Sequence, residues 1–102
     1  MILKENVDIL GLKPETLMAI IIADSVWTKH GQELVLTSVT DSVHSKYSRH
    51  NFGMAFDCRT RYFTAAEKKA VVKELKKALG KHFNVVVHST HIHVAYKPMR
   101  VK

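Results

Sequence analysis

Four side chains that can bind a metal ion lie in two short stretches of the chain. His50 and Asp57 are seven positions apart, and His91 and His93 alternate in a later apolar run. Together they offer enough nitrogen and oxygen ligands for one zinc ion, and three of them would leave a coordination position open. Catalytic zinc keeps such a position for water, whereas structural zinc is closed by four ligands, mostly Cys and His. Because Cys58 is the only cysteine, the pattern indicates catalysis rather than a zinc finger.

The spacing of these residues suits two strands. Side chains two positions apart in a strand lie on one face, so His91 and His93 would point one way while the intervening apolar residues enter a core. In the strand expected at Met54–Cys58, Asp57 shares its face with glycine and alanine, which leaves room for an ion and a substrate. Cys58 lies on the opposite, apolar face, where we expect a small buried hydrophobic residue.

Two motifs carry a resemblance to a known family. The sequence SRHNFGMAFD at Ser48–Asp57 fits the pattern SxHxxGxAxD, and HIHV at His91–Val94 supplies an HxH element. In both motifs the chain resembles the superfamily of zinc D-alanyl-D-alanine carboxypeptidases and murein peptidases. This superfamily also includes phage endolysins and the hedgehog signalling domain. The order of elements is similar too, and the resemblance covers roughly residues 13–97.

The resemblance implies a set of zinc ligands and a neighbouring base. His50, Asp57 and His93 would bind zinc, and His91 would lie beside the metal-bound water. Many relatives place a glutamate general base shortly before the last histidine, but no glutamate follows Glu74 in this chain. The acid and base roles would therefore fall to His91, because imidazole exchanges protons near neutral pH.

Two further residues receive roles beside this site. His88 would help His91 if a two-residue turn joins the last two strands, since the two histidines would then face each other on one side of the sheet. Many bacterial relatives hold the substrate carboxylate with an arginine in a Ser-Gly-Tyr-Arg-like stretch, which this chain lacks. Arg49 is our candidate to replace that arginine, with Arg59 and Lys46 as the other possibilities.

By this resemblance we expect a zinc metallopeptidase that hydrolyses peptide bonds of peptidoglycan stem peptides. It would be a D-alanyl-D-alanine carboxypeptidase or an endolysin-type endopeptidase, of phage or bacterial type, that degrades the cell wall. Zinc would be the cofactor and would activate a water molecule and polarise the scissile carbonyl. Two other interpretations stay open. A non-catalytic, zinc-containing binding module of the same fold is favoured by the missing glutamate, and a basic nucleic-acid-binding protein is favoured only by charge.

Composition is that of one soluble globular domain spanning residues 1–102. The chain has 46% hydrophobic and 25% charged residues, which argues for a folded core. Its net charge of +7 favours an anionic partner such as cell wall, nucleic acid or an anionic membrane surface. We expect the peptidoglycan peptide to be that partner and nucleic acid to be the weaker candidate, and we expect a monomer.

The first residues lack the features of a secretory signal, and the apolar run Leu17–Ala23 is too short to span a bilayer. We therefore expect no membrane anchor and synthesis in the cytoplasm. Action on the cell wall would then require release or delivery by another component.

The elements that would position the site follow from hydrophobic periodicity. We expect an α+β fold with a mainly antiparallel central sheet of about four strands, two packed helices and zinc on the open sheet face. The first helix is apolar almost all round and should lie under the sheet, and the second has a capping box followed by an apolar stripe. The expected helices are Lys13–Lys29 and Thr64–Leu79, and the other expected strands are Glu33–Thr40, His82–His88 and His91–Lys97.

Overall fold

A computed structural model describes residues 1–5, 7, 9, 11–39 and 54–97 of the chain. Two helices and five strands lie within these residues. The strands are β1 (Ile2–Leu3), β2 (Val35–Ser38), β3 (Ala55–Arg59), β4 (Phe83–Val87) and β5 (His91–Tyr96), and the helices are α1 (Pro14–Lys29) and α2 (Ala65–Leu79). The α+β class and the two packed helices are as predicted.

The strands form one sheet in the order β1-β2-β3-β5-β4. Three neighbouring pairs are antiparallel, and β1 adds to β2 in parallel at the edge. The prediction of a mainly antiparallel sheet is therefore confirmed. The sequence did not predict β1, because two residues are too few to show the alternation by which a strand is recognised.

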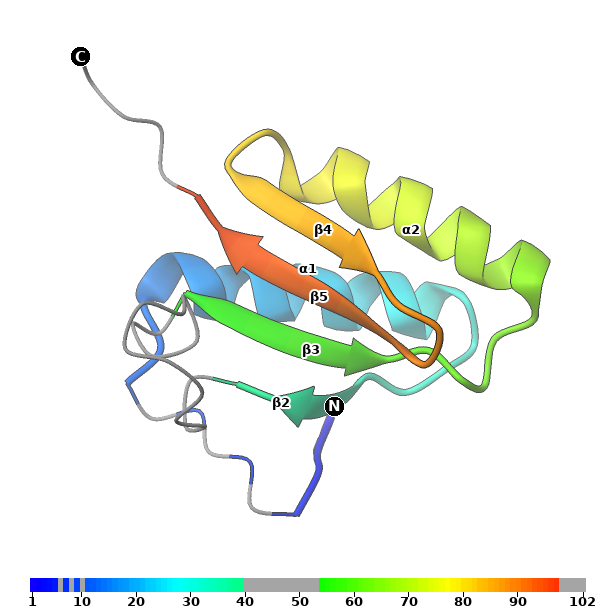
Figure 1. Ribbon diagram of the computed structural model, residues 1–102, viewed down its shortest axis with the longest axis horizontal. Coiled ribbons are helices and arrows are strands. Elements are labelled where there is room, and N and C mark those ends of the chain that lie inside the picture. Colours follow the sequence, from blue (N-terminus) through cyan, green and yellow to red (C-terminus); the bar gives the residue numbers. More distant parts are fainter. Residues whose placement is uncertain (6, 8, 10, 40–53, 98–102) are drawn as a thin grey trace.

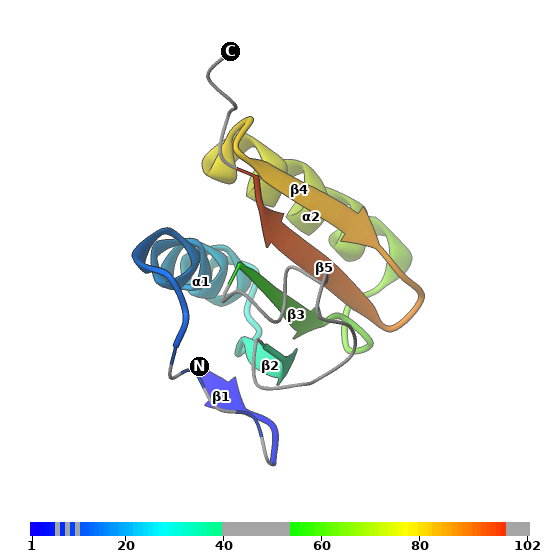
Figure 2. The same cartoon turned by 60° about the vertical axis from the view of Figure 1, so that its left-hand side comes forward.

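Both helices cover the same face of the sheet (Figures 1 and 2). The side chains that alternate toward this layer are fully buried, and they come from β2, β3 and β5 as well as from the helices. The largest are Trp27, Phe56, Leu34, Leu36, Leu75 and Ile92. The intervening side chains of β3 and β5 lie on the opposite face, which neither helix covers.

Helix α1 begins at Pro14, whose missing N–H costs nothing in a first turn, and ends before Gly31, which adopts a φ of 76°. Its inner face is buried against the sheet and α2, as predicted. Its outer face is not buried, because no further layer covers it in the described part of the chain. Met18 and Ile21 are 59% and 63% exposed, and an all-round apolar sequence gave no sign of which face this would be.

Helix α2 has the predicted capping box. The Thr64 hydroxyl accepts a hydrogen bond from the Glu67 N–H at 3.1 Å, and the Glu67 carboxylate accepts one from the Thr64 N–H at 2.8 Å. The stripe of Val71, Leu75 and Leu79 is buried. Among the described residues, no helix is both long enough and apolar enough to cross a membrane.

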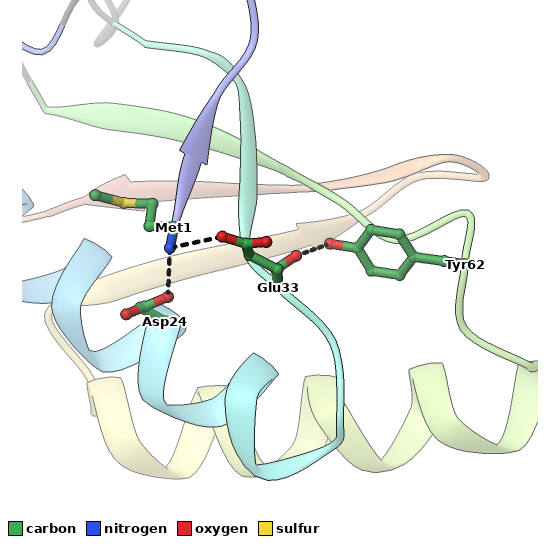
Figure 3. A network of polar contacts seen from close by, with 4 residues as sticks. All are labelled: Met1, Asp24, Glu33 and Tyr62. Carbon is green, nitrogen blue, oxygen red and sulfur yellow. Dashed lines mark hydrogen bonds and ion pairs between the residues drawn. The ribbon is translucent and has the colours of Figure 1, made fainter.

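A polar network fixes the parallel edge strand to the rest of the fold (Figure 3). The Met1 amino group lies 3.6 Å from Asp24 of α1 and 3.5 Å from the Glu33 carboxylate, which precedes β2. The Tyr62 hydroxyl donates a hydrogen bond to the Glu33 carbonyl oxygen at 2.7 Å. The network links β1, α1, the approach to β2 and the segment after β3.

Candidate functional site

The centre of the site is a pair formed by Asp57 and His93. The two residues are direct cross-strand partners in β3 and β5, two neighbouring strands in the interior of the sheet. The Asp57 Oδ1 atom lies 2.7 Å from the His93 Nδ1 atom, a hydrogen-bonding distance. Both side chains are only partly exposed, at 17% and 25%, which shields their contact from water.

The alternation of β3 decides which way Asp57 points. Phe56 and Cys58 are fully buried on the helix side, so Asp57 between them projects to the open face. The same holds for His93 between Ile92 and Val94. The prediction that Cys58 is a buried hydrophobic residue turned away from the site is confirmed. Burial raises the pKa of its thiol well above the ordinary value, and the neighbouring Asp57 charge adds to this.

The Asp57–His93 pair fits a zinc ion in ligand type, with a small adjustment in spacing. Carboxylate oxygen and imidazole nitrogen both bind zinc at about 2.0–2.2 Å, which separates two donor atoms on a tetrahedral ion by about 3.3 Å. The observed 2.7 Å would therefore have to widen by about 0.6 Å. Within the described residues no cluster of three or more His, Cys, Asp or Glu side chains could hold a metal. His50, the third expected ligand, lies outside the described residues.

His91 stands beside this pair on the same face, two residues before His93 in β5. Its ring stacks on that of His88, with centroids 4.5 Å apart and an interplanar angle of 20°. The His88 N–H donates a hydrogen bond to the His91 carbonyl oxygen at 2.9 Å, which closes the two-residue connection between β4 and β5. The predicted placement of His88 opposite His91 is therefore confirmed, whereas their roles in proton transfer stay predictions.

The connection between these strands is supported from α2. Its residues, Ser89 and Thr90, are not those that favour a tight hairpin turn. The Lys68 ammonium donates hydrogen bonds to the carbonyl oxygens of His88 and Ser89, at 2.5 and 3.1 Å. These bonds hold the turn, and with it the stacked histidines, against the helix layer.

A polar pocket of about 190 Å³ lies next to His91. Arg59 is the direct cross-strand partner of His91 and projects from β3 to the same face as Asp57. The remaining lining residues come from the ends of β1 and β2 and from the segments flanking β3 and β5: they are Lys4, Thr37, Arg61 and Thr90. Three cationic side chains and no acidic one line the pocket within the described residues, so it suits an anionic group.

The strand that carries Asp57 and Arg59 is anchored from the helix side. The Trp27 indole N–H donates a hydrogen bond to the Arg59 carbonyl oxygen at 3.1 Å. Trp27 is fully buried and packs edge-on against Phe63, with ring centroids 5.7 Å apart. Just beyond Arg59, the Thr60 N–H donates to the Thr90 carbonyl oxygen at 3.0 Å, which continues the pairing of the two strands past the pocket.

The structure thus brings together four of the six residues predicted for the site. Asp57, His93, His91 and His88 share the open face, and the other two, His50 and Arg49, lie outside the described residues. Sequence reasoning did not identify the roles of Arg61 and Lys4 in the pocket. Lys4 in particular depends on the parallel pairing of β1, which no local pattern indicates.

Comparisons of the chain with protein-family models, with curated proteins and with solved structures found no match.

Proposed function

We propose that this chain is a zinc-dependent peptidase that hydrolyses peptide bonds in the stem peptides of peptidoglycan. The observation that carries the proposal is the contact of Asp57 with His93 on the open sheet face, with His91 next to it on the same face. The resemblance of the two motifs to zinc murein peptidases supplies the reaction class. The net charge of +7 supports an anionic polymer such as the cell wall as substrate.

In this proposal His50, Asp57 and His93 hold the zinc ion. Bound zinc would lower the pKa of a water molecule and polarise the scissile carbonyl. His91 would take the proton of the attacking water and pass it to the leaving amine. Because the His91 Nδ1 atom faces the Thr90 hydroxyl at 3.4 Å, this transfer would use the Nε2 atom. The stacked ring of His88 would restrict the rotation of His91 and keep that atom in place.

The cationic pocket supports a substrate that carries a carboxylate near the scissile bond. Arg59 lies two residues beyond Asp57 in β3, which is about 7 Å along a strand. A peptide bound at the Asp57–His93 pair could therefore place a carboxylate between Arg59 and Arg61 while its scissile carbonyl stays at the metal. In this proposal Arg59 holds the substrate carboxylate, the role for which the sequence indicates Arg49 as the preferred candidate and Arg59 as another. A bidentate arginine contact would fix the register of such a substrate.

A second function, zinc-dependent binding without hydrolysis, is favoured by one observation. No glutamate follows Glu74, so the open face carries no glutamate from β5 that could act as a general base. In this case the site would bind its ligand through the same cationic pocket but would lack turnover.

The test is the release of new amino groups from purified peptidoglycan by zinc-loaded protein, with zinc content measured in parallel. His93→Ala should abolish both zinc binding and release. His82→Ala is the matched control, because it removes a histidine that lines a different pocket, on the helix side. Release by the parent and by the control supports the peptidase. Stoichiometric zinc with no release supports the binding module, and absence of zinc binding by the parent contradicts both functions.

A further inference from the structure

The outer edge of β4 ends the sheet. Within the described residues β4 pairs only with β5, in antiparallel register. Hydrogen bonds join His88 to His91 at one end of this pair and Lys97 to His82 at the other, with donor–acceptor distances of 2.9 and 2.5 Å. Because hydrogen-bonded and non-hydrogen-bonded pairs alternate in an antiparallel ladder, Val85 and Val87 direct their N–H and C=O groups away from β5. No other strand of the described residues pairs with these donors and acceptors.

A groove of about 590 Å³ runs beside this edge. One wall is Val87 of β4, and the other is the first half of α2, with Ala65, Ala66 and Val72 among its lining residues. The side chains of the two alanines are small, so the backbone of another chain could approach the helix closely. Val87, which lines the groove, is 46% exposed, and β4 has neither a charge nor a proline to block pairing.

The charge of the groove decides which kind of segment fits it. Lys68 and Lys69 complete its lining, and no acidic side chain lines it within the described residues. The two acidic residues of α2 have other partners: Glu67 belongs to the capping box, and Glu74 pairs with Lys29 at 3.2 Å. The hydrogen bonds of the Lys68 ammonium to His88 and Ser89 go to carbonyl oxygens, not to a carboxylate. The groove is therefore cationic and apolar at once.

A second copy of the chain fits this groove poorly. Pairing two β4 edges would bring the two lysine-bearing helices together, in molecules that each carry a net charge of +7. An acidic segment would instead be attracted to the groove, because its carboxylates would face the lysines. Its alternate apolar side chains would cover Val87 and Val72.

We propose that β4 and α2 bind an extended, acidic segment of a partner protein, which adds to the sheet as a sixth strand beside β4. Backbone hydrogen bonds to Val85 and Val87 would supply affinity, and the lysines and the shallow alanine wall would supply specificity. This inference does not depend on the proposed peptidase function, because the groove lies on the helix side of β4, outside the open-face pocket of Arg59 and His91.

The experiment uses a library of nine-residue peptides in which Asp or Glu alternates with Val, Ile, Thr or Tyr, screened against the full chain by fluorescence anisotropy. Amide chemical shifts and hydrogen exchange then locate the bound peptide. We expect binders with slowed exchange of the Val85 and Val87 amides. The same peptides, N-methylated at the alternate residues whose N–H groups face β4, should bind at least about tenfold more weakly, because they lose strand hydrogen bonds. Lysine in place of the acidic residues should also abolish binding.

Two variants of α2 separate the groove from general basicity. Lys69→Glu should weaken peptide binding at least tenfold, whereas Lys77→Glu, the same charge change two helical turns further along α2, should weaken it less than threefold. Ala66→Glu should block the groove without unfolding the helix, since an acidic residue is favourable in a first turn. The proposal is overturned if no library member binds more tightly than about 1 mM. It is also overturned if shifts map away from β4 and α2, if the two lysine variants behave alike, or if the chain instead forms a dimer that protects Val85 and Val87.

Discussion

Arg59 and His91 face each other across β3 and β5, two residues along each strand from the pair of Asp57 and His93. The open face therefore carries these groups in a fixed order: the Asp57–His93 pair, then a histidine with a cation opposite. A substrate lying along β3 would meet these groups in sequence. The order sets up a separation of roles that substitutions can test.

Arg59→Gln should raise the KM for a substrate that carries a carboxylate next to the scissile bond and should change kcat little. A hydrogen bond to a charged group contributes about 1.5–3 kcal/mol, which corresponds to a rise in KM of about 10- to 150-fold. The measurement compares each peptide with its amidated form, and the amidated form should show no difference between parent and variant. An equal loss for both peptides would contradict a carboxylate contact.

Asp57→Asn should weaken zinc binding by at least about 10- to 100-fold, the loss typical even of a residue that only supports a ligand, while the fold is kept because the amide is nearly isosteric. Competition with a chromophoric chelator measures the zinc affinity, and thermal unfolding of the zinc-free protein checks the fold. The His82→Ala control should bind zinc as the parent does. Unchanged affinity in Asp57→Asn would remove Asp57 from the metal site.

His91→Ala should reduce peptidase turnover by about 10²- to 10⁴-fold and leave zinc stoichiometry intact, as expected for a general acid and base. His88→Phe should retain most of the activity, because a phenyl ring can stack on His91 as the imidazole does. His88→Ala should lose more activity than His88→Phe. If His88→Phe is as inactive as His91→Ala, then His88 itself takes part in proton transfer.

The capping box of α2 should make stability depend on acid. The backbone N–H of Thr64 is the main cause that lowers the pKa of Glu67 below its ordinary value, with the Thr64 side chain second. A carboxylate whose pKa is lower in the folded state stabilises the fold above the unfolded pKa, and this contribution is lost as the pH falls through the folded pKa. The difference in free energy of unfolding between the parent and Glu67→Ala should therefore be larger at pH 6 than at pH 3, with the parent more stable at pH 6. Thr64→Ala should cost about 1 kcal/mol at neutral pH.

The Cys58 thiol should be almost inert in the folded protein. It is fully buried, and its raised pKa leaves little thiolate at neutral pH. Reaction with a thiol-specific chromogenic reagent should be slower by several orders of magnitude in buffer than in denaturant. Rapid modification under native conditions would mean that β3 separates from the helix layer far more often than the packing implies.

The parts of the fold that could be predicted are those with a local physical cause. Helix α2 was predictable because Thr64, Glu67 and Gly80 mark its ends and its apolar residues recur with helical period. The alternation of β5 likewise suffices to place His91 and His93 on one face of the sheet. For α1, local sequence gave the element but not its orientation, because apolar residues on every side do not distinguish Ile20, which is buried, from Ile21, which is exposed.

The rest of the site depends on pairings between distant segments. The cationic pocket exists because β1 lies parallel to β2 and brings Lys4 near Arg59, and neither residue carries a signal of the other in the sequence. The groove beside β4 depends on the packing of α2 next to this edge strand of the sheet. Such features follow from tertiary packing, which periodicity and motif spacing do not specify.

The hydrogen bond from Trp27 to the Arg59 carbonyl oxygen also has a practical consequence. Trp27 is the single tryptophan of the chain, it is screened from water, and its indole touches the backbone of the strand that carries Asp57 and Arg59. Its emission spectrum should therefore report the environment of that strand without any attached dye. A shift of the emission maximum on adding zinc or a peptide would signal that ligand binding on the open face is transmitted through β3 to the helix layer.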